Sequence, residues 1–520
     1  MAIGIDLGTC FTLSAYIKDG NPMIIPNTYG NRLTPSCVAI SNSEILIGED
    51  AVYVKNDPDY VFIEKSKINI GTKEKYKTPQ GIFTPEDIAY IILKHTIEYS
   101  ELYLGATISE AVVTVPAYFN AKQRKLTKEA AEKTGVKVLR IISEPTSASL
   151  ATNGISKGSN ILVYDFGGGT FDCSILQYNN DWAQVISTNG NINLGGKNID
   201  ECIVKHILPG INKNHQSYGK LVSMCEAAKK ILSSKEEVVI NLKEIFPNFD
   251  KVKLSYKDFK SITKDIINKT KGCIYECIKD SGLEIKEINH VLLVGGSSRL
   301  RPVQELLEQI FNKKPIFLNN PDESVALGAA IHAHELSEKD YKTLVIDIIP
   351  MSLSVKVDNG MCKKIILKNS PIPISKTEIF TTAYDNQESV VVEVYQGENE
   401  LAKNNHFIGQ ITLDNIKKDV RGEPKIHVGF DIDANASLQV TVRDDDTGSI
   451  NIATLDYVEN KDIEMIDEET EIIIVNLKNK LKTLIYRPNL QQEHLEMIDY
   501  ALHNNNIEIL QSTIQEIESL

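Results

Sequence analysis

Short apolar runs alternate with helical stripes along the first part of the chain. Apolar runs of strand length occupy residues 3–5, 112–115 and 161–164, and residues 85–104 place apolar side chains at helical spacing. Strands that alternate with helices in this way are typical of an α/β domain. The pattern therefore predicts an α/β unit at the amino-terminal end of the chain.

Helical stripes interrupt this alternation over residues 197–290. A strand at 291–294 and a helix near 302–311 then restore it, so we expect one α/β domain over residues 1–340 that carries a mainly helical insertion. The stripes that predict the helices of the insertion lie at residues 199–208, 221–232 and 256–281.

Apolar and polar residues alternate strictly after residue 350. The short apolar run Leu344-Val345-Ile346-Asp347 precedes this region, and we expect residues 341–349 to form a linker. Runs of alternation separated by turn sequences such as Asp358-Asn359-Gly360 are typical of a β-sandwich, which we place at residues 350–460. Helical stripes return in residues 461–520, and these stripes leave dimerisation open as their role.

Composition narrows the class of protein. Of the 520 residues, 42% are hydrophobic and 24% charged, which excludes the disordered and collagen classes. The 56 basic and 70 acidic residues give a net charge of −14, and a nucleic-acid partner is not expected because phosphate binding favours a basic surface. No apolar run approaches the length of a membrane span, so we expect a cytoplasmic protein with no membrane partner.

The cysteines show neither a disulfide framework nor a zinc site. None of them forms a CxxC pair, and Cys273 and Cys277 are most simply buried thiols one helical turn apart. We expect reduced thiols in a reducing compartment. The eight cysteines are residues 10, 37, 173, 202, 225, 273, 277 and 362.

A loose repeat carries the main chemical signal. Ile5-Asp6-Leu7-Gly8-Thr9 follows one strand, and Tyr164-Asp165-Phe166-Gly167-Gly168-Gly169-Thr170 follows another. Glycines let backbone N–H groups approach a phosphate chain, and a carboxylate can hold Mg²⁺ through water. One such motif alone fits a simple hairpin turn, but Gly295-Gly296-Ser297-Ser298-Arg299 at a third strand end makes the set far more specific. Neither a Walker loop nor a Rossmann fingerprint is present.

These motifs resemble the superfamily of actin, sugar kinases and the 70-kDa heat-shock ATPases. Further stretches resemble DnaK-type heat-shock chaperones over residues 2–458, and the short form of the chain is most similar to the divergent HscC branch. The resemblance implies an actin-like, two-lobed α/β ATPase of duplicated ribonuclease H-like fold, then a β-sandwich and a truncated helical lid. The stretches include Val113-Thr114-Val115-Pro116-Ala117-Tyr118-Phe119, Ile142-Ser143-Glu144-Pro145-Thr146 and Asn320-Pro321-Asp322-Glu323-Ser324.

By resemblance, the cofactors are ATP or ADP with Mg²⁺, and K⁺ stays open as a further ion. Asp6 and Asp165 would hold the water-coordinated Mg²⁺, and Thr9 and Thr170 would contact the phosphates. Lys67 would neutralise the transferring phosphoryl group, although taken alone it reads as a solvated surface lysine. The implied catalytic residues are Lys67, Glu144, Asp165, Thr170 and Asp172.

The resemblance also implies which residues surround the rest of the nucleotide. Lys230 stands where many relatives have an arginine over the adenine, and a lysine stacks less well than a planar guanidinium. The implied nucleotide-binding residues are Gly8, Thr9, Cys10, Gly167, Gly168, Gly169, Gly195, Gly196, Glu226, Lys229, Lys230, Ser233, Gly295, Gly296, Ser297, Arg299 and Asp322.

In the sandwich, the resemblance implies a groove for an extended client segment. Val390 would form its floor, Phe380 its wall, and Cys362 with Ala383 an arch over the client. Taken singly, each of these residues reads as an ordinary core or loop residue. Cys362 in place of a bulky methionine would weaken the arch.

Coupling between the ATPase and the sandwich is expected to involve Pro116, Arg124, Arg140 and the linker residue Asp347. An exposed tether is the alternative interpretation of the linker. Arg140 matches the position that meets a J-domain co-chaperone, so the resemblance implies such a partner. The exchange factor stays open because the insertion is short.

The sequence therefore predicts an ATP-dependent chaperone that binds extended segments of unfolded client proteins. The alternative is a nucleotide-gated regulatory module for one specific partner. A sugar kinase or filament protein would keep the ATP site, but neither explains residues 350–460.

Overall fold

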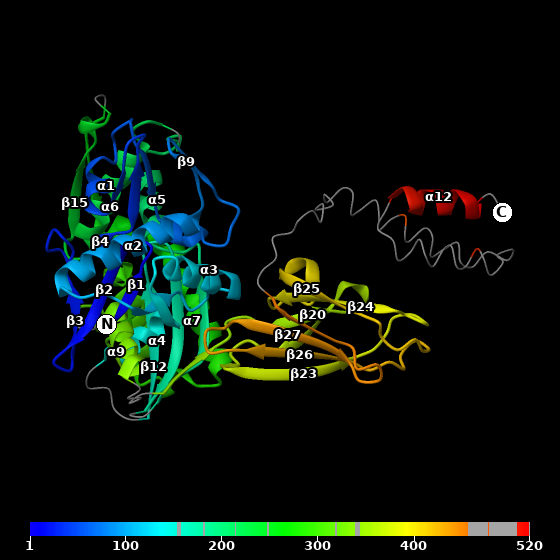
Figure 1. Ribbon diagram of the computed structural model, residues 1–520. Coiled ribbons are helices and arrows are strands. Elements are labelled where there is room, and N and C mark those ends of the chain that lie inside the picture. The colour runs from blue at the N-terminus through cyan, green and yellow to red at the C-terminus, as the bar shows by residue number, and fades with distance from the viewer. Residues whose placement is uncertain are drawn as a thin grey trace. The chain divides into compact units, whose positions relative to one another are not determined.

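The structure is a computed structural model of the whole chain, and it divides into two units, Met1–Tyr457 and Val458–Leu520 (Figure 1). The residues it describes are 1–152, 158–179, 182–213, 215–246, 249–317, 320–338, 344–455 and 507–518, with the single residues 477 and 494.

A six-stranded sheet forms the base of the first lobe. Its central strand, β1, pairs in parallel with β10 and antiparallel with β2, and residues 3–7 of β1 are buried because helices cover the sheet. The strands are β1 (Ala2–Leu7), β2 (Phe11–Lys18), β3 (Asn21–Ile25), β4 (Thr34–Pro35), β10 (Glu110–Val115) and β11 (Lys137–Ser143). The helices of this lobe are α1 (Glu49–Tyr53), α2 (Pro85–Leu104), α3 (Ala121–Glu132), α4 (Glu144–Leu150) and α9 (Ser324–Glu338). Smaller sheets are β5 (Cys37–Ile40), β6 (Ile45–Ile47) and β7 (Val61–Glu64), and β8 (Tyr76–Thr78) with β9 (Gly81–Phe83).

Helix α2 begins and ends at the residues that the pattern predicts, because the sequence has residues that favour a helix start and a helix end at these positions. Thr84 accepts a hydrogen bond from Asp87 N, and the Asp87 side chain accepts one in return from Thr84 N. Pro85 follows at the first helical position, where its missing N–H costs no hydrogen bond. Gly105 ends the helix in the left-handed conformation, with φ of 63°.

A seven-stranded sheet forms the base of the second lobe and continues into the linker. Its order is β18-β17-β12-β13-β14-β19-β22, so the linker strand β19 (Leu344–Ile348) lies between the ATPase strand β14 and the sandwich strand β22. The linker is thus not an exposed tether, and Val345, Asp347 and Ile348 are buried. The other strands are β12 (Ser159–Phe166), β13 (Phe171–Tyr178), β14 (Trp182–Asn191), β17 (His290–Val294), β18 (Ile316–Phe317) and β22 (Pro371–Ile372).

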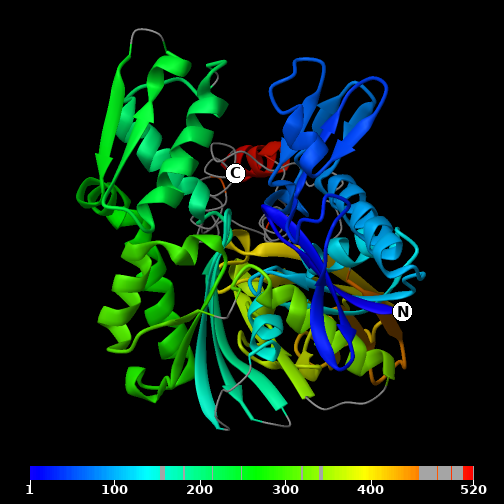
Figure 2. The same cartoon turned by 90° about the vertical axis from the view of Figure 1, so that its left-hand side faces the viewer.

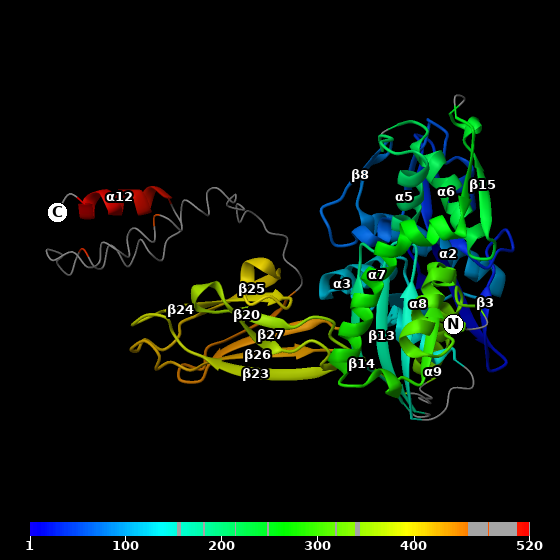
Figure 3. The same cartoon turned by 180° about the vertical axis from the view of Figure 1, so that it is seen from behind.

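The insertion contains a hairpin as well as helices. Helices α5 (Gly196–Ile207), α6 (Tyr218–Leu232) and α7 (Tyr256–Ser281) follow the predicted stripes. The pattern did not predict the hairpin of β15 (Glu237–Asn241) and β16 (Lys251–Ser255). Figure 2 shows the two large sheets, the first in blue and cyan and the second in teal, and Figure 3 shows α7 beside β13 and β14. Helix α8 (Arg301–Phe311) follows β17.

Two four-stranded sheets form the β-sandwich. The core between them contains Leu353, Val394, Phe430 and Val440. One sheet comprises β20 (Leu353–Lys356), β21 (Cys362–Ile366), β24 (Ser389–Gln396) and β25 (His406–Asp414), and the other β23 (Ile374–Phe380), β26 (Ile426–Ile432), β27 (Leu438–Asp444) and β28 (Ile450–Thr454).

The predicted lid at 461–520 falls mainly outside the described residues, and its described helix is α12 (Ile507–Glu518). In the part of the chain that the structure describes, no helix is both long and apolar enough to cross a bilayer. The eight cysteines are free thiols.

Candidate ATP site, client groove and coupling residues

The loops that follow β1, β12 and β17 meet at one cavity. The motifs predicted to hold phosphate therefore come from both lobes and face one another. The predicted site residues that line the cavity are Asp6, Gly8, Thr9, Cys10, Lys67, Glu144, Asp165, Gly167, Gly168, Thr170, Gly295, Gly296 and Asp322.

The loops around the cavity approach one another so closely that several of their positions have room only for glycine. A Cβ atom on Gly168 would lie 2.2 Å from Cys10 Sγ, and one on Gly195 would lie 2.6 Å from backbone atoms of Gly169. Backbone N–H groups hold the loops together, since Gly196 N donates to Gly167 O at 3.0 Å and Lys197 N donates to Gly168 O at 2.9 Å. Side chains at these positions would force the two loops apart.

Buried carboxylates surround the cavity. Burial, followed by the charge of Glu144, raises the pKa of Asp6 from 3.8 to about 7. The same two causes raise the pKa of Asp172 to about 7, and they raise the pKa of Asp165 as well. Thr114 Oγ1 donates to Asp6 Oδ1 at 3.0 Å, and Tyr118 N donates to Asp172 Oδ1 at 3.3 Å.

Lys67 is the buried cation among these carboxylates. It lies at the end of β7, in the 3₁₀ turn Ser66–Asn69, and it forms an ion pair with Glu144. Its side chain is only 5% exposed, so it is not the solvated surface lysine that the isolated sequence suggests. The Phe119 ring lies 5.9 Å from its Nζ and shields it from water.

The donor set fits Mg²⁺ with a nucleotide. Mg²⁺ is usually held by one or two carboxylates together with water and phosphate oxygens. Asp6 and Asp165 present such carboxylates to the cavity, where burial and then the charge of Glu144 raise their pKa values, so a bound cation would stabilise their charged forms. Among the described residues, no three His, Cys, Asp or Glu side chains gather closely enough to bind a metal ion directly, so protein carboxylates alone do not complete a metal site.

The predicted adenosine residues lie behind the glycine loops. Lys229 donates to Gly196 O at 3.3 Å and pairs with Asp200 at 2.8 Å. Lys230 instead pairs with Glu226 at 2.9 Å on the exposed side of α6, and Ser233 ends that helix. Ser297 Oγ donates to Gly167 O at 2.9 Å, and Arg299 pairs with Asp322 at 2.7 Å.

Several residues around the cavity were not predicted. Asp200 positions Lys229 through an ion pair, and Thr114 positions Asp6 through a hydrogen bond. No sequence motif marks Asp200 or Thr114 as a site residue, because only the fold brings each of them to its partner. The others are apolar residues that the loops bring to the cavity wall, namely Phe11, Leu13, Leu33, Val294, Pro321 and Val325.

A groove opens at one end of the sandwich. Phe380, Ala383 and Val390 line it, and Ala383 N donates to Gln387 Oε1 at 2.9 Å, which holds the loop in place. The predicted arch residue Cys362 accepts a hydrogen bond at its Sγ from Asn405 Nδ2 at 3.4 Å, and its place over a client stays a prediction. Asp358, in the turn Asp358–Gly360, also lines the groove.

A series of contacts leads from the ATP site to the linker. Asp172 accepts from Tyr118 N, in the loop that follows Pro116. Arg124 donates to Phe119 O and to Ala117 O at 3.2 and 3.3 Å. Arg124 Nη1 also lies 3.8 Å from Asp347 Oδ2 on β19. The predicted coupling residues Pro116, Arg124 and Asp347 are therefore contiguous.

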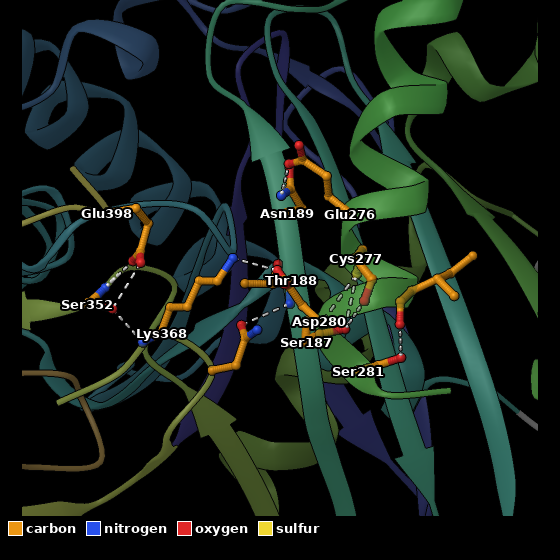
Figure 4. A network of polar contacts seen from close by, with 12 residues as sticks. Ser187, Thr188, Asn189, Glu276, Cys277, Asp280, Ser281, Ser352, Lys368 and Glu398 are labelled. Atoms are coloured by element: carbon orange, nitrogen blue, oxygen red, sulfur yellow. Dashed lines mark hydrogen bonds and ion pairs between the residues drawn. The ribbon is translucent and has the colours of Figure 1, made fainter. Parts of the chain in front are cut away.

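The second lobe also contacts the sandwich directly. Lys368 Nζ lies 2.7 Å from Asp280 Oδ2 on α7, as Figure 4 shows. On β14, Thr188 N donates to Asn369 Oδ1 at 3.4 Å. On the first lobe, Ile141 N donates to Asn435 Oδ1 at 3.1 Å.

Comparison with known proteins decides the family. A family model described as Hsp70 protein matches residues 2–73 and 54–519. The chain belongs to the Hsp70 family. The chaperone protein DnaK of Mycoplasma mycoides subsp. mycoides SC is 38% identical over 519 residues, covering 96% of this chain and 87% of the relative. The DnaK proteins of Mycoplasma mobile and Cyanidium caldarium are 37% and 38% identical, over 92% and 96% of this chain and 83% and 89% of the relatives.

Membership in the Hsp70 family fixes the activity of the chain. It is an ATPase and an ATP-dependent molecular chaperone, with the two-lobed actin-like ATPase and the β-sandwich of that family. The comparisons favour this function over a regulatory module for one partner. They do not separate the HscC branch from DnaK proteins, so the branch stays a prediction.

Proposed function

We propose that ATP hydrolysis in the cavity between the two lobes controls how tightly the sandwich groove holds an extended segment of an unfolded client. The observation that carries this proposal is the series of contacts from Asp172 through Arg124 to Asp347. It joins the ATP site to the linker strand, and the linker strand pairs with the sandwich strand β22.

Within the cavity, the residues have distinct tasks. Asp6 and Asp165 would hold Mg²⁺ through water, and the ion would supply charge neutralisation for the β- and γ-phosphates. Thr9 and Thr170 would donate hydrogen bonds to phosphate oxygens. Lys67, which Glu144 holds in place, would neutralise the transferring phosphoryl group and orient the attacking water.

The remaining predicted nucleotide-binding residues have two roles. Glu226, Lys230, Ser233 and Arg299 would surround the adenosine, and their ion pairs fix the position of the side chains. The glycine loops would keep the phosphates close to backbone N–H groups.

In the groove, the apolar side chain of a client residue would contact Phe380 and Val390. Backbone hydrogen bonds from the client to the loops around Ala383 would supply affinity that does not depend on sequence. Cys362 would form the arch over the client together with Ala383, and its Sγ accepts from Asn405 Nδ2 at 3.4 Å.

The partners would be unfolded or extended client polypeptides and a J-domain co-chaperone at Arg140, with the exchange factor open. We place the activity in the cytoplasm, where reduced thiols such as the eight of this chain persist.

A release experiment tests this function. A fluorescent unfolded peptide is bound to the full-length protein, and its dissociation is followed after addition of MgATP or MgADP. The proposal predicts faster release with ATP than with ADP. Equal rates of release with both nucleotides would contradict it.

A further inference from the structure

Arg140 connects the first lobe to the linker strand. It lies on β11, and its Nη2 donates to the carbonyl oxygen of Val345 at 3.2 Å. Its Nη1 lies 3.4 Å from Nε2 of His332 on α9. A guanidinium group has only donors, so Nε2 must accept this bond. The imidazole is then neutral, with its hydrogen on Nδ1.

His332 is buried among charged groups. Its side chain is 3% exposed, and Nδ1 lies 3.9 Å from Oε2 of Glu335, which is also buried. Among the described residues, Arg140 from β11 and Glu335 from α9 are the charged groups that face it. Arg140 in turn faces Asp347, Arg124 and Asp433.

Polar groups in this cluster are incompletely paired. Among the described residues, Arg140 Nε, His332 Nδ1 and Glu335 Oε2 have no hydrogen-bond partner although they are buried. Buried polar groups without a hydrogen-bond partner cost free energy. One further change of charge in this cluster would therefore easily destabilise the linker strand β19 in its docked position, that is, paired with β14.

We propose that His332 is a positioning residue controlled by a proton: the neutral imidazole orients Arg140 to hold Val345, and protonation of Nε2 releases the linker strand from β14. The proton comes from solvent and bonds to the lone pair that accepts from Arg140. Two cations then face each other, and the Nη1 bond is lost. This inference rests on the proposed function, because the docked strand joins the ATP site to the groove.

The direction of the pH effect follows from the burial of His332. Burial is the largest cause of its lowered pKa, and Glu335 opposes the shift while Arg140 adds to it. The docked state therefore disfavours the imidazolium. Below the usual imidazole pKa near 6.5, the docking equilibrium constant falls up to tenfold for each unit of pH. Docking should therefore be strongest above pH 7 and decline below pH 6.5.

The single tryptophan of the chain reports on this strand. Trp182 on β14 stands in register with Leu344 on β19, so release of the strand changes its surroundings. The full-length protein is mixed with saturating MgATP at pH 5.0 to 8.0, and Trp182 emission is read before one turnover. The variant Asp347→Asn, which lacks the ion pair between Arg124 and the linker strand, gives the reference emission of the protein with this strand released.

The variants have matched expectations. We expect His332→Gln to show no pH-dependent emission change below pH 6.5, because its amide accepts from Arg140 and does not titrate. The control His334→Gln changes an exposed histidine of the same helix and should keep the wild-type curve. Glu335→Gln should enlarge the loss of docking at the lowest pH, because its carboxylate stabilises the imidazolium of the docked state, and it tests the inference even if His332→Gln fails to fold.

A flat wild-type curve, or equal curves for wild type and His332→Gln, would overturn the inference. Peptide stimulation of ATP turnover at pH 7.5 is measured beside it. Loss of that stimulation in the wild type would overturn the proposed function, whereas its presence with a flat curve would overturn only the role of His332.

Discussion

Arg124 and Asp347 form a buried ion pair between the first lobe and the linker, with 3.8 Å between Nη1 and Oδ2. Both side chains are at most 5% exposed, and the Arg124 Nη1 has no hydrogen-bond partner among the described residues. Removing the charge of one member leaves the other buried and uncompensated. This ion pair is therefore one of the contacts that join the first lobe to the linker strand, beside the bond from Arg140 to Val345.

Asp347→Asn should therefore abolish the effect of client peptide on ATP turnover while basal hydrolysis stays near normal. Single-turnover hydrolysis with and without peptide measures both quantities. Asp265→Asn, at an exposed position on α7, is the matched control and should behave as wild type. Equal peptide stimulation in Asp347→Asn and the parent would contradict this prediction.

Thr170→Ala should lower the rate of hydrolysis by about tenfold to a hundredfold, because one hydrogen bond to a charged group contributes about 1.5–3 kcal/mol. Thr170 is buried and lines the cavity. The rate constant for bound ATP measures the effect, with the exposed Thr107→Ala as control. A rate within twofold of wild type would exclude Thr170 from the phosphate contacts.

Asp6→Asn should stabilise the nucleotide-free protein, and more so as the pH rises from 4 to 7. The pKa of Asp6 is raised to about 7, so the folded state binds more protons than the unfolded state over this range and loses stability as pH increases. Asparagine removes that loss. Urea unfolding at pH 5.0 and 7.5 measures the difference, and the exposed Asp59→Asn serves as control. The prediction fails if the gain in stability is equal at both pH values.

Val390→Phe should weaken the binding of an unfolded peptide by tenfold or more, because the larger ring fills the space that a client side chain would occupy. Fluorescence anisotropy of a labelled peptide measures the affinity. The matched control is Val239→Phe, which changes an exposed residue of the β15 hairpin in the ATPase. Unchanged peptide affinity would show that the client binds elsewhere.

Much of the fold could be predicted from local sequence. Helix α7 begins and ends where predicted, because Ser255 caps its first turn and Gly282 ends it in the left-handed conformation. The hairpin of β15 and β16 was missed because its alternation is short and mixed with charged residues, so it resembles neither a buried strand nor a helix.

The candidate site was predictable to a similar degree. Glycine motifs at strand ends revealed the ATP cavity because their chemistry is local. The place of Cys362 in an arch over the client stays a prediction, because an arch forms between segments that the sequence pattern alone does not bring together. Contacts between distant segments, such as those of His332 and Asp200, follow from the fold alone.

The central claim is that client binding and ATP turnover are coupled through the linker strand. Single-turnover hydrolysis of ATP by the full-length protein, with and without an unfolded peptide, tests it most directly. The account predicts that peptide raises the rate of turnover in the wild type and that this increase disappears in Asp347→Asn. If peptide has no effect on turnover in the wild type, the account is wrong.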